Sequence, residues 1–156
     1  MVASDTPGAR PDPVQADVDS MSLKAQAGVG QHCILHVDDD ALMRDAMGTM
    51  LRFLGYDPVM AASGEEALAV LATGLRPAMV ILDMNMPGLG GAATLPRLRA
   101  LWPDLPVLIA TGRVDESVRQ LIRCHPRVGL MPKPFHLRDL RQHLGEWLLS
   151  LPHQDR

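Results

Sequence analysis

Five short apolar runs alternate with five segments of helical pattern, and this alternation constrains the fold more than any other feature of the chain. The apolar runs cover residues 33–37, 57–61, 78–82, 106–110 and 128–132, and the helical segments cover 41–54, 64–73, 94–101, 115–124 and 136–150. Strands that alternate with helices predict a parallel sheet wrapped by helices. An uninterrupted apolar run such as "VLIA" (107–110) is typical of a strand covered on both faces. The sequence therefore predicts an α/β fold with five parallel strands.

Local signals mark several helix ends. Ser63 followed three residues later by Glu66 predicts a capping box at the start of the second helical segment. Gly55 and Gly74 predict the C-terminal ends of the first and second segments. Asp40 can act as the N-cap of the first segment.

Apolar side chains at helical spacing predict which faces of the helices meet the core. In the first segment the predicted stripe is Leu42, Ala46, Met50 and Leu54, with Met43, Met47 and Leu51 beside it; in the last it is Leu137, Leu140, Leu144 and Leu148. Pro96 lacks a backbone N–H and fits only the first turn of a helix. We therefore expect the third helix to start late, with Thr94 as its N-cap.

The chain divides into three parts by composition. Residues 1–30 contain many Pro and Gly residues and few large apolar ones, so they predict a disordered tail, and Met21 is an alternative start of translation. Residues 31–151 predict one folded domain, and 152–156 a frayed end.

Charge and cysteine usage limit the classes of function. The net charge is −3 and there is no basic run, which argues against nucleic acid as a direct partner. No run of 18 apolar residues is present, so we expect no membrane insertion. Cys33 and Cys124 are isolated from each other in sequence, which favours a reducing cytoplasm.

Polar side chains stand at the ends of four predicted strands. Asp38 and Asp39 follow the first run, Asp83 the third, Thr111 the fourth, and Lys133 the fifth. The carboxyl ends of parallel strands meet at one edge of a sheet, where ligands of such folds bind. Each residue alone could belong to an ordinary turn, but together they form a chemically complementary set.

This set suits phosphoryl chemistry. Crowded carboxylates repel one another and call for a counter-ion, and Mg²⁺ is held by one or two carboxylates while it binds phosphate oxygens. A lysine and a hydroxyl supply further partners for the phosphoryl oxygens. One of the carboxylates can then act as a nucleophile that forms an aspartyl phosphate.

Four segments carry a resemblance to a known family. "HVDDD", "ILDMNMPGLGG", "IATG" and "LMPKPF", in this order and spacing, resemble the receiver domain of two-component response regulators over residues 33–150. The resemblance implies a flavodoxin-like, doubly wound sheet of strand order 2-1-3-4-5. It also implies a signalling protein whose only catalysis is its own Mg²⁺-dependent phosphorylation and dephosphorylation.

The resemblance assigns roles to the acidic residues. Asp83 would be the phosphoacceptor. Asp39 would bind Mg²⁺ directly and Asp38 mostly through water, and Asn85 would offer its backbone carbonyl to the ion.

It also implies roles for the remaining strand-end residues and for partners. Thr111 would bond a phosphoryl oxygen after transfer, and Lys133, placed by a cis bond to Pro134, would pair with the same group. The donor would be a phosphohistidine on a sensor histidine kinase or a histidine phosphotransfer protein. The phosphorylated state would repack the surface of the fourth helix, fifth strand and fifth helix. The output would be contact with a downstream protein that the sequence does not name.

Two residues depart from or complicate the pattern. Leu130 stands where receivers commonly carry an aromatic residue, which predicts a weaker or different switch on that face. His36 lies inside a predicted strand, and we interpret it as a satisfied core or edge histidine. Only 21 residues follow Phe135, so we expect a stand-alone receiver.

Alternative functions stay open at this point. The chain could be a phosphorelay shuttle that passes the phosphoryl group on, or a receiver-fold interaction module with weak or no switching. A phosphatase with an aspartyl intermediate would usually carry a second acid where Asn85 stands. A nucleotide-binding module would need a glycine-rich loop after a strand, and none follows any of the predicted strands.

Overall fold

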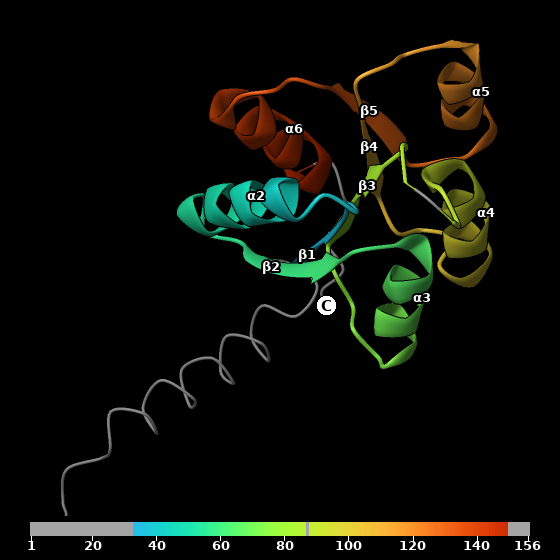
Figure 1. Cartoon of the computed structure of the whole chain (residues 1–156), viewed down its shortest axis with the longest axis horizontal. Coiled ribbons are helices and arrows are strands. Elements are labelled where there is room, and N and C mark those ends of the chain that lie inside the picture. The colour runs from blue at the N-terminus through green and yellow to red at the C-terminus, as the bar shows by residue number, and fades with distance from the viewer. Residues whose placement is uncertain (1–32, 87, 150–156) are drawn as a thin grey trace, which may run out of the picture.

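The computed structural model describes residues 33–86 and 88–149, without the side chain of Leu149 (Figure 1). The predicted tail over residues 1–30 and the predicted end at 152–156 lie outside these residues.

The centre of the fold is a sheet of five parallel strands in the order β2-β1-β3-β4-β5, which confirms the predicted topology. The strands are β1 (Cys33–Val37), β2 (Asp57–Ala61), β3 (Met79–Asp83), β4 (Val107–Thr111) and β5 (Val128–Pro132). The order of the strands reverses between β1 and β3, so the crevice where ligands bind in such sheets lies at the ends of these two strands.

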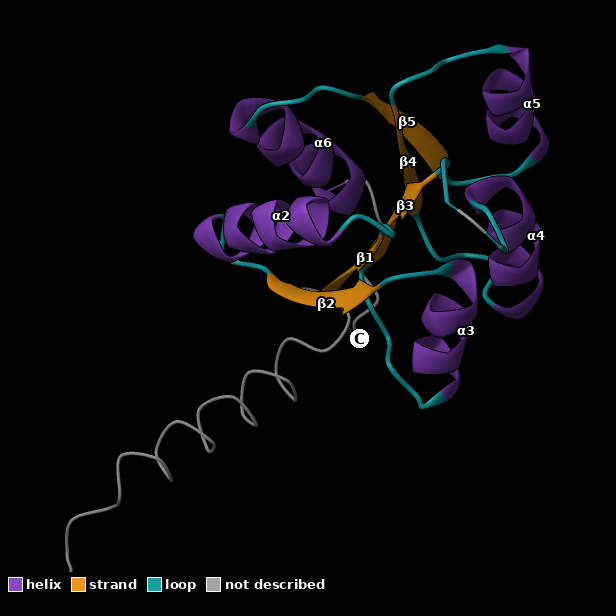
Figure 2. Cartoon of the chain, viewed as in Figure 1, coloured by secondary structure: helices purple, strands orange, loops and turns teal. Residues whose placement is uncertain are grey.

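Helices cover both faces of the sheet (Figure 2). They are α2 (Ala41–Phe53), α3 (Gly64–Ala72), α4 (Gly91–Leu101), α5 (Glu116–Cys124) and α6 (Leu137–Leu149). Helices α2 and α6 lie on one face, and α3, α4 and α5 lie on the other.

Strand side chains alternate between these two faces and divide the core into two clusters. Under α2 and α6 the buried members include Ile34, Met79, Ile81, Leu108, Met47, Leu51, Leu140 and Leu144. Under α3, α4 and α5 they include Leu35, Val80, Leu82, Ile109, Ala67, Leu95, Leu98 and Val118. Because each fully buried large apolar side chain contributes about 1.5–3 kcal/mol, these clusters hold the central strands rigidly at the crevice.

The predicted caps of α2 and α3 are confirmed. The Asp40 carboxylate accepts hydrogen bonds from the backbone of the first turn of α2. Ser63 Oγ accepts from the N–H of Glu66 at 3.0 Å, and the Glu66 carboxylate accepts from the N–H of Ala62 at 2.6 Å. Gly55 has a φ of +97° after α2, a conformation that glycine adopts without steric cost.

Strands β3 and β4 each begin and end one residue later than the apolar runs. Pro106 has no N–H to give to a neighbouring strand, although its carbonyl accepts from Val80 at 2.9 Å. As a result Asp83 and Thr111 are the last residues of their strands, and Asp83 pairs with Ala110. Both polar side chains are therefore held by the sheet itself.

The predicted late start of α4 is wrong. The helix begins at Gly91 with Gly90 as its N-cap, and Thr94 lies within the helix, where its hydroxyl donates to the Gly90 carbonyl at 2.8 Å. Pro96 consequently sits in the second turn and leaves the Ala92 carbonyl without its helical partner. The early start is possible because Gly91 has no side chain and the helix can begin against the end of β3.

The predicted core face of α2 is also partly wrong. Met47 and Leu51 are buried, but Leu42 and Ala46 are exposed. Apolar residues surround most of this helix, so their spacing did not fix which side faces the sheet. In α6 the prediction was closer, because Leu140 and Leu144 are buried and Leu137 and Leu148 are half-buried.

Helix α6 packs against the edge strand through one large ring. A Cβ at Gly129 in β5 would lie 2.5 Å from an atom of the Trp147 indole, so only glycine leaves room for the ring. The indole thus occupies the space that a side chain at position 129 would take on this face of β5.

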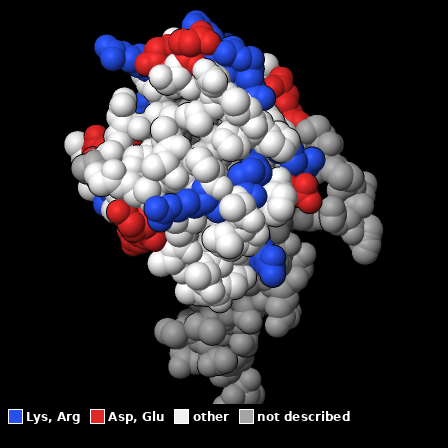
Figure 3. Space-filling view, turned by 90° about the vertical axis from the view of Figure 1, so that its right-hand side faces the viewer, with Lys and Arg blue, Asp and Glu red and all other residues white. Residues whose placement is uncertain are grey.

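The face formed by α3, α4 and α5 carries basic and acidic side chains interspersed among uncharged ones, with some basic side chains near its centre (Figure 3). No continuous basic surface is visible among the described residues on this face. None of the helices in residues 33–86 and 88–149 combines the length and apolar character that a membrane span requires.

Candidate functional site

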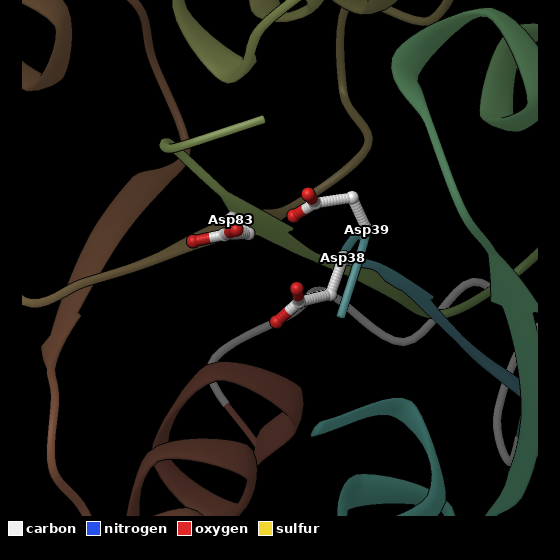
Figure 4. A group of neighbouring side chains, drawn as sticks. All are labelled: Asp38, Asp39 and Asp83. Carbon is white, nitrogen blue, oxygen red and sulfur yellow. The ribbon is translucent and has the colours of Figure 1, made fainter. Parts of the chain in front are cut away.

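Three carboxylates meet in the crevice at the ends of β1 and β3. Ligand oxygens of Asp38, Asp39 and Asp83 all lie within 4.8 Å of one another, and Figure 4 shows the three side chains gathered from the two strand ends. Asp38 and Asp83 are buried, whereas Asp39 is exposed. The sequence predicted this grouping.

Lys133 brings a positive charge to the same place. Its Nζ lies 3.1 Å from Asp83 Oδ1, where it donates a hydrogen bond, and 3.5 Å from Asp38 Oδ2. The Lys133–Pro134 bond is cis, as expected. The Lys133 backbone N–H donates to the Thr111 carbonyl at 2.7 Å, which ties the lysine to the end of β4.

The turn that carries Asp38 and Asp39 is fixed from several sides. The Asp38 N–H donates to the Ala61 carbonyl at 3.0 Å, and the Asp40 N–H donates to Asp38 Oδ1 at 2.9 Å. Arg44 Nη1, from the end of the first turn of α2, donates to the Asp38 carbonyl at 2.8 Å. Sequence reasoning missed Arg44, although a long basic side chain about one helical turn after an N-cap can reach back to the strand end.

Opposing influences act on the Asp83 carboxyl. Burial raises its pKa above the ordinary value and outweighs the hydrogen bond and charge of Lys133, which lower it. Repulsion by Asp38 raises the pKa further, and a backbone hydrogen bond from Asn85 lowers it. Without further positive charge, Asp83 therefore holds its proton more tightly than an ordinary aspartate.

Thr111 is buried at the end of β4, and its hydroxyl is engaged in its own turn. Thr111 Oγ1 donates to the Arg113 carbonyl and accepts from the Arg113 N–H, both at 3.1 Å. The structure thus places Thr111 at the predicted edge of the sheet, in contact with the loop that follows it.

The loop after Asp83 passes very close to the start of α4. A Cβ at Gly91 would lie 2.5 Å from the Asp83 carbonyl oxygen and 2.8 Å from Met84 Cα, so a side chain there would displace the loop. Gly88 has a φ of +69° in the same loop. Asn85, whose carbonyl was assigned to a metal by resemblance, is exposed in this segment.

His36 is a buried histidine that is not satisfied, contrary to the interpretation from sequence. It is 1% exposed in the central strand β1, and its Nδ1 has no hydrogen-bond partner. Its Nε2 lies 3.8 Å from Asp38 Oδ2. Burial lowers the pKa of His36 to about 4, against the opposing charge of Asp38. The ring is therefore neutral near pH 7.

The sequence matches the response regulator receiver domain family over residues 34–145. The chain belongs to this family.

Relatives with known names agree with this assignment. The receiver domain is 39% identical over 107 residues to "Response regulator MprA" of Mycolicibacterium vanbaalenii, and the same identity is found with "Response regulator MprA" of Mycobacterium sp. strain KMS. Each alignment covers 69% of this chain and 46% of the relative, so the chain spans less than half of the length of these relatives.

Solved structures share the fold. The chemotaxis protein CheY4 of Vibrio cholerae superposes with a TM-score of 0.68 at 29% identity, over 73% of this chain and 96% of that one. The response regulator TrrA of Thermotoga maritima, solved in complex with Mg²⁺ and BeF, superposes with a TM-score of 0.65 at 26% identity, over 74% of this chain and 97% of that one.

The acidic cluster of this receiver domain has the donor set of a hard divalent cation. All three ligands are carboxylates, the type that Mg²⁺ prefers. Asp38 Oδ2 is buried without a hydrogen-bond partner, and its nearest cation, Lys133, stays at 3.5 Å. A buried acceptor with unused capacity is costly unless something binds it, so the residues present fit a magnesium ion.

Proposed function

We propose that this receiver domain accepts a phosphoryl group on Asp83 from the phosphohistidine of a sensor histidine kinase or a histidine phosphotransfer protein. The downstream signal would be contact with a protein partner. One observation carries the proposal: a buried carboxylate at the end of the third strand is hydrogen bonded by Lys133 and lies beside two further carboxylates. This arrangement combines a nucleophile, Asp83, with a cation, Lys133, and with two carboxylates that suit a metal ion.

The chemistry is a transfer between two nucleophiles. Asp83 Oδ attacks phosphorus as the bond from phosphorus to the donor's imidazole nitrogen breaks, and that nitrogen keeps the electron pair and takes a proton from water. Lys133 Nζ donates to a phosphoryl oxygen in place of Asp83 Oδ1, so its charge stays with the negative charge as it moves. The tightly fixed turn at Asp38 keeps the acidic pair aligned while this happens.

The magnesium site would be formed by Asp38, Asp39, Asp83 and the backbone carbonyl of Asn85. When bound, the ion supplies positive charge that lowers the proton affinity of Asp83 and balances the phosphoryl oxygens. The raised pKa of Asp83 is the reason that this charge is needed. We place the protein in the cytoplasm as part of the proposal, because both cysteines are free thiols.

Thr111 would link the phosphoryl group to the surface. To donate to a phosphoryl oxygen, its hydroxyl must give up the hydrogen bond that it donates to the Arg113 carbonyl, and this would loosen the loop between β4 and α5. The change is a shift between two packings that differ in the partners of one hydroxyl.

Leu130 supports a second candidate, an interaction module with weak switching. Leu130 is half-buried and packs against the core under α3, α4 and α5. The position therefore lacks an aromatic ring that could change its rotamer when Thr111 moves. Backbone NMR shifts distinguish the two candidates. Little change around Leu130 after phosphorylation favours the module, and a broad change over α5, β5 and α6 favours the switch.

The proposal is tested by incubation with acetyl phosphate and Mg²⁺, followed by intact-protein mass spectrometry. The wild type should gain one phosphoryl mass, and Asp83→Asn should gain none. Asp104→Asn, a change at an exposed aspartate of a loop, is the matched control and should behave as the wild type. EDTA should abolish the gain in the wild type and in Asp104→Asn. Phosphorylation of the Asp83→Asn protein at the wild-type rate would exclude Asp83 as the acceptor.

A further inference from the structure

On the side that faces away from the sheet, helix α2 exposes a row of two large apolar residues and two small residues. Leu42, Ala46, Thr49 and Phe53 follow one another at spacings of four, three and four residues, so they share one side of the helix. All four are exposed, Leu42 by 79% and Phe53 by 71%. We call these four residues the outer stripe.

The outer stripe is not explained by the packing of the domain. The inner side of α2 already meets the core through Met47 and Leu51. Among the described residues only three large apolar side chains are strongly exposed, and two of them, Leu42 and Phe53, belong to this stripe. A single exposed leucine needs no explanation, but two large apolar side chains exposed on the same side of one helix indicate a site of association.

Two opposite charges flank the outer stripe on the same side. Asp45 and Arg52 are seven residues apart, close to two full turns, so they project from the same flank. Both are exposed, and neither has an ion-pair partner within the part of the chain that the structure describes. Arg52 leans toward the N-terminal end of the helix, with its Nη1 3.4 Å from the place where a Cβ of Gly48 would stand.

We propose that the outer stripe is the contact between two copies of this chain, with their α2 helices antiparallel about a twofold axis. Leu42 of one copy then lies against Phe53 of the other, and Ala46 lies against Thr49. The short residues in the middle let the helices approach closely, and the large ones fill the ends. Such a contact is self-complementary, as a twofold dimer requires.

The charges favour the antiparallel arrangement over a parallel one. A twofold axis perpendicular to the helices keeps each flank on its own side, so Asp45 of one copy meets Arg52 of the other, and the pair occurs twice. In a parallel dimer the flank with Asp45 and Arg52 would face the opposite flank, which carries Met43, Met50 and Leu54 and no charge. Only the antiparallel dimer gives both charged residues a partner.

The contact is small, because it rests mainly on one helix of 13 residues. Stable interfaces bury roughly 800 Å² on each partner. We therefore expect a reversible dimer that forms at protein concentrations of roughly 100 μM and is absent near roughly 1 μM. The proposal uses none of the residues of the proposed phosphoacceptor site and stands or falls separately from it.

Analytical ultracentrifugation of the full chain tests the proposal by charge reversal. Asp45→Arg alone and Arg52→Asp alone each place like charges opposite one another twice, and each should raise the dissociation constant of the dimer roughly 10- to 30-fold. The two single variants mixed in equal amounts should associate with each other as tightly as the wild type, because both pairs are again opposite in sign. The double variant Asp45→Arg/Arg52→Asp should also recover the dimer.

Apolar variants and a matched control complete the test. The double variant Leu42→Ser/Phe53→Ser should remove the dimer. The control is Leu101→Ser, which changes an exposed large apolar residue on α4 and should leave the dimer intact. Circular dichroism checks that each variant is folded. A wild-type chain that stays monomeric at roughly 500 μM overturns the proposal and leaves the stripe to another partner or to residues 1–32. A mixture of the two charge variants that stays monomeric overturns the antiparallel arrangement.

Discussion

Replacement of His36 by leucine should remove a large part of the acid sensitivity of the fold. His36 is buried in β1 with an unpartnered Nδ1. Burial, helped by the like charges of Lys133 and Arg44, lowers its pKa to about 4, and Asp38 offsets only part of this. Leucine has a similar volume and no ionisable group, so His36→Leu deletes the titration and keeps the side chain apolar.

The sign of the effect follows from the two protonation states. The pKa of His36 is lower in the folded protein than the ordinary value of 6.5 in the unfolded chain, so the unfolded chain binds the proton first. The contribution of neutral His36 to the free energy of unfolding is therefore fully present above pH 6.5 and is lost as the pH falls toward 4. The loss amounts to about 2 kcal/mol between pH 7 and pH 5 and about 3 kcal/mol by pH 4.

Urea unfolding of the metal-free protein at pH 7, 6 and 5 measures this loss. The free energy of unfolding of the wild type should fall by about 2 kcal/mol more than that of His36→Leu between pH 7 and pH 5. His136→Gln, at an exposed histidine, is the control and should follow the wild type. The comparison uses the change in the free energy of unfolding with pH for each protein, so a difference in absolute stability between the two proteins does not affect the result. Equal pH slopes for the wild type and His36→Leu would refute the reasoning.

Three further substitutions test other parts of the structure. Ser63→Ala removes the capping box of α3 and should lower the free energy of unfolding in urea by about 1 kcal/mol; a loss below about 0.3 kcal/mol would contradict this. Gly91→Ala places a Cβ 2.5 Å from the Asp83 carbonyl oxygen and should cost about 1–3 kcal/mol by the same assay, whereas the open position Gly145→Ala should cost nothing. Lys133→Met removes the donor at Asp83 and should slow phosphorylation by acetyl phosphate on the order of 100-fold, with a wild-type rate as the contrary outcome.

The order and the kind of elements could be predicted because strands and helices have different sequence patterns in this chain. Uninterrupted apolar runs mark buried parallel strands, and capping residues such as Ser63 fix where helices begin. The grouping of Asp38, Asp83 and Lys133 then followed from the rule that strand ends of a parallel sheet meet at one edge. Their assigned roles came from resemblance and remain proposals.

Several details could not be predicted, since they depend on packing between distant segments. The start of α4 is set by the fit of Gly91 against the end of β3, which overrides the preference of Pro96 for a first turn. The core face of α2 was misassigned because apolar residues occur on two sides of the helix, and only the sheet decides which side is buried. The missing partner of His36 has no local signature at all, because it depends on what surrounds the ring in three dimensions.

The contact between Trp147 and Gly129 makes Trp147 an intrinsic fluorescent probe of the position of α6. The chain has two tryptophans, and the ring of Trp147 lies against the bare backbone of Gly129 at the edge of the sheet. Any sliding of α6 along that edge would uncover the indole to water and shift its emission to longer wavelength. With Trp102 changed to phenylalanine, the remaining fluorescence would report the position of one helix in real time, without an attached dye.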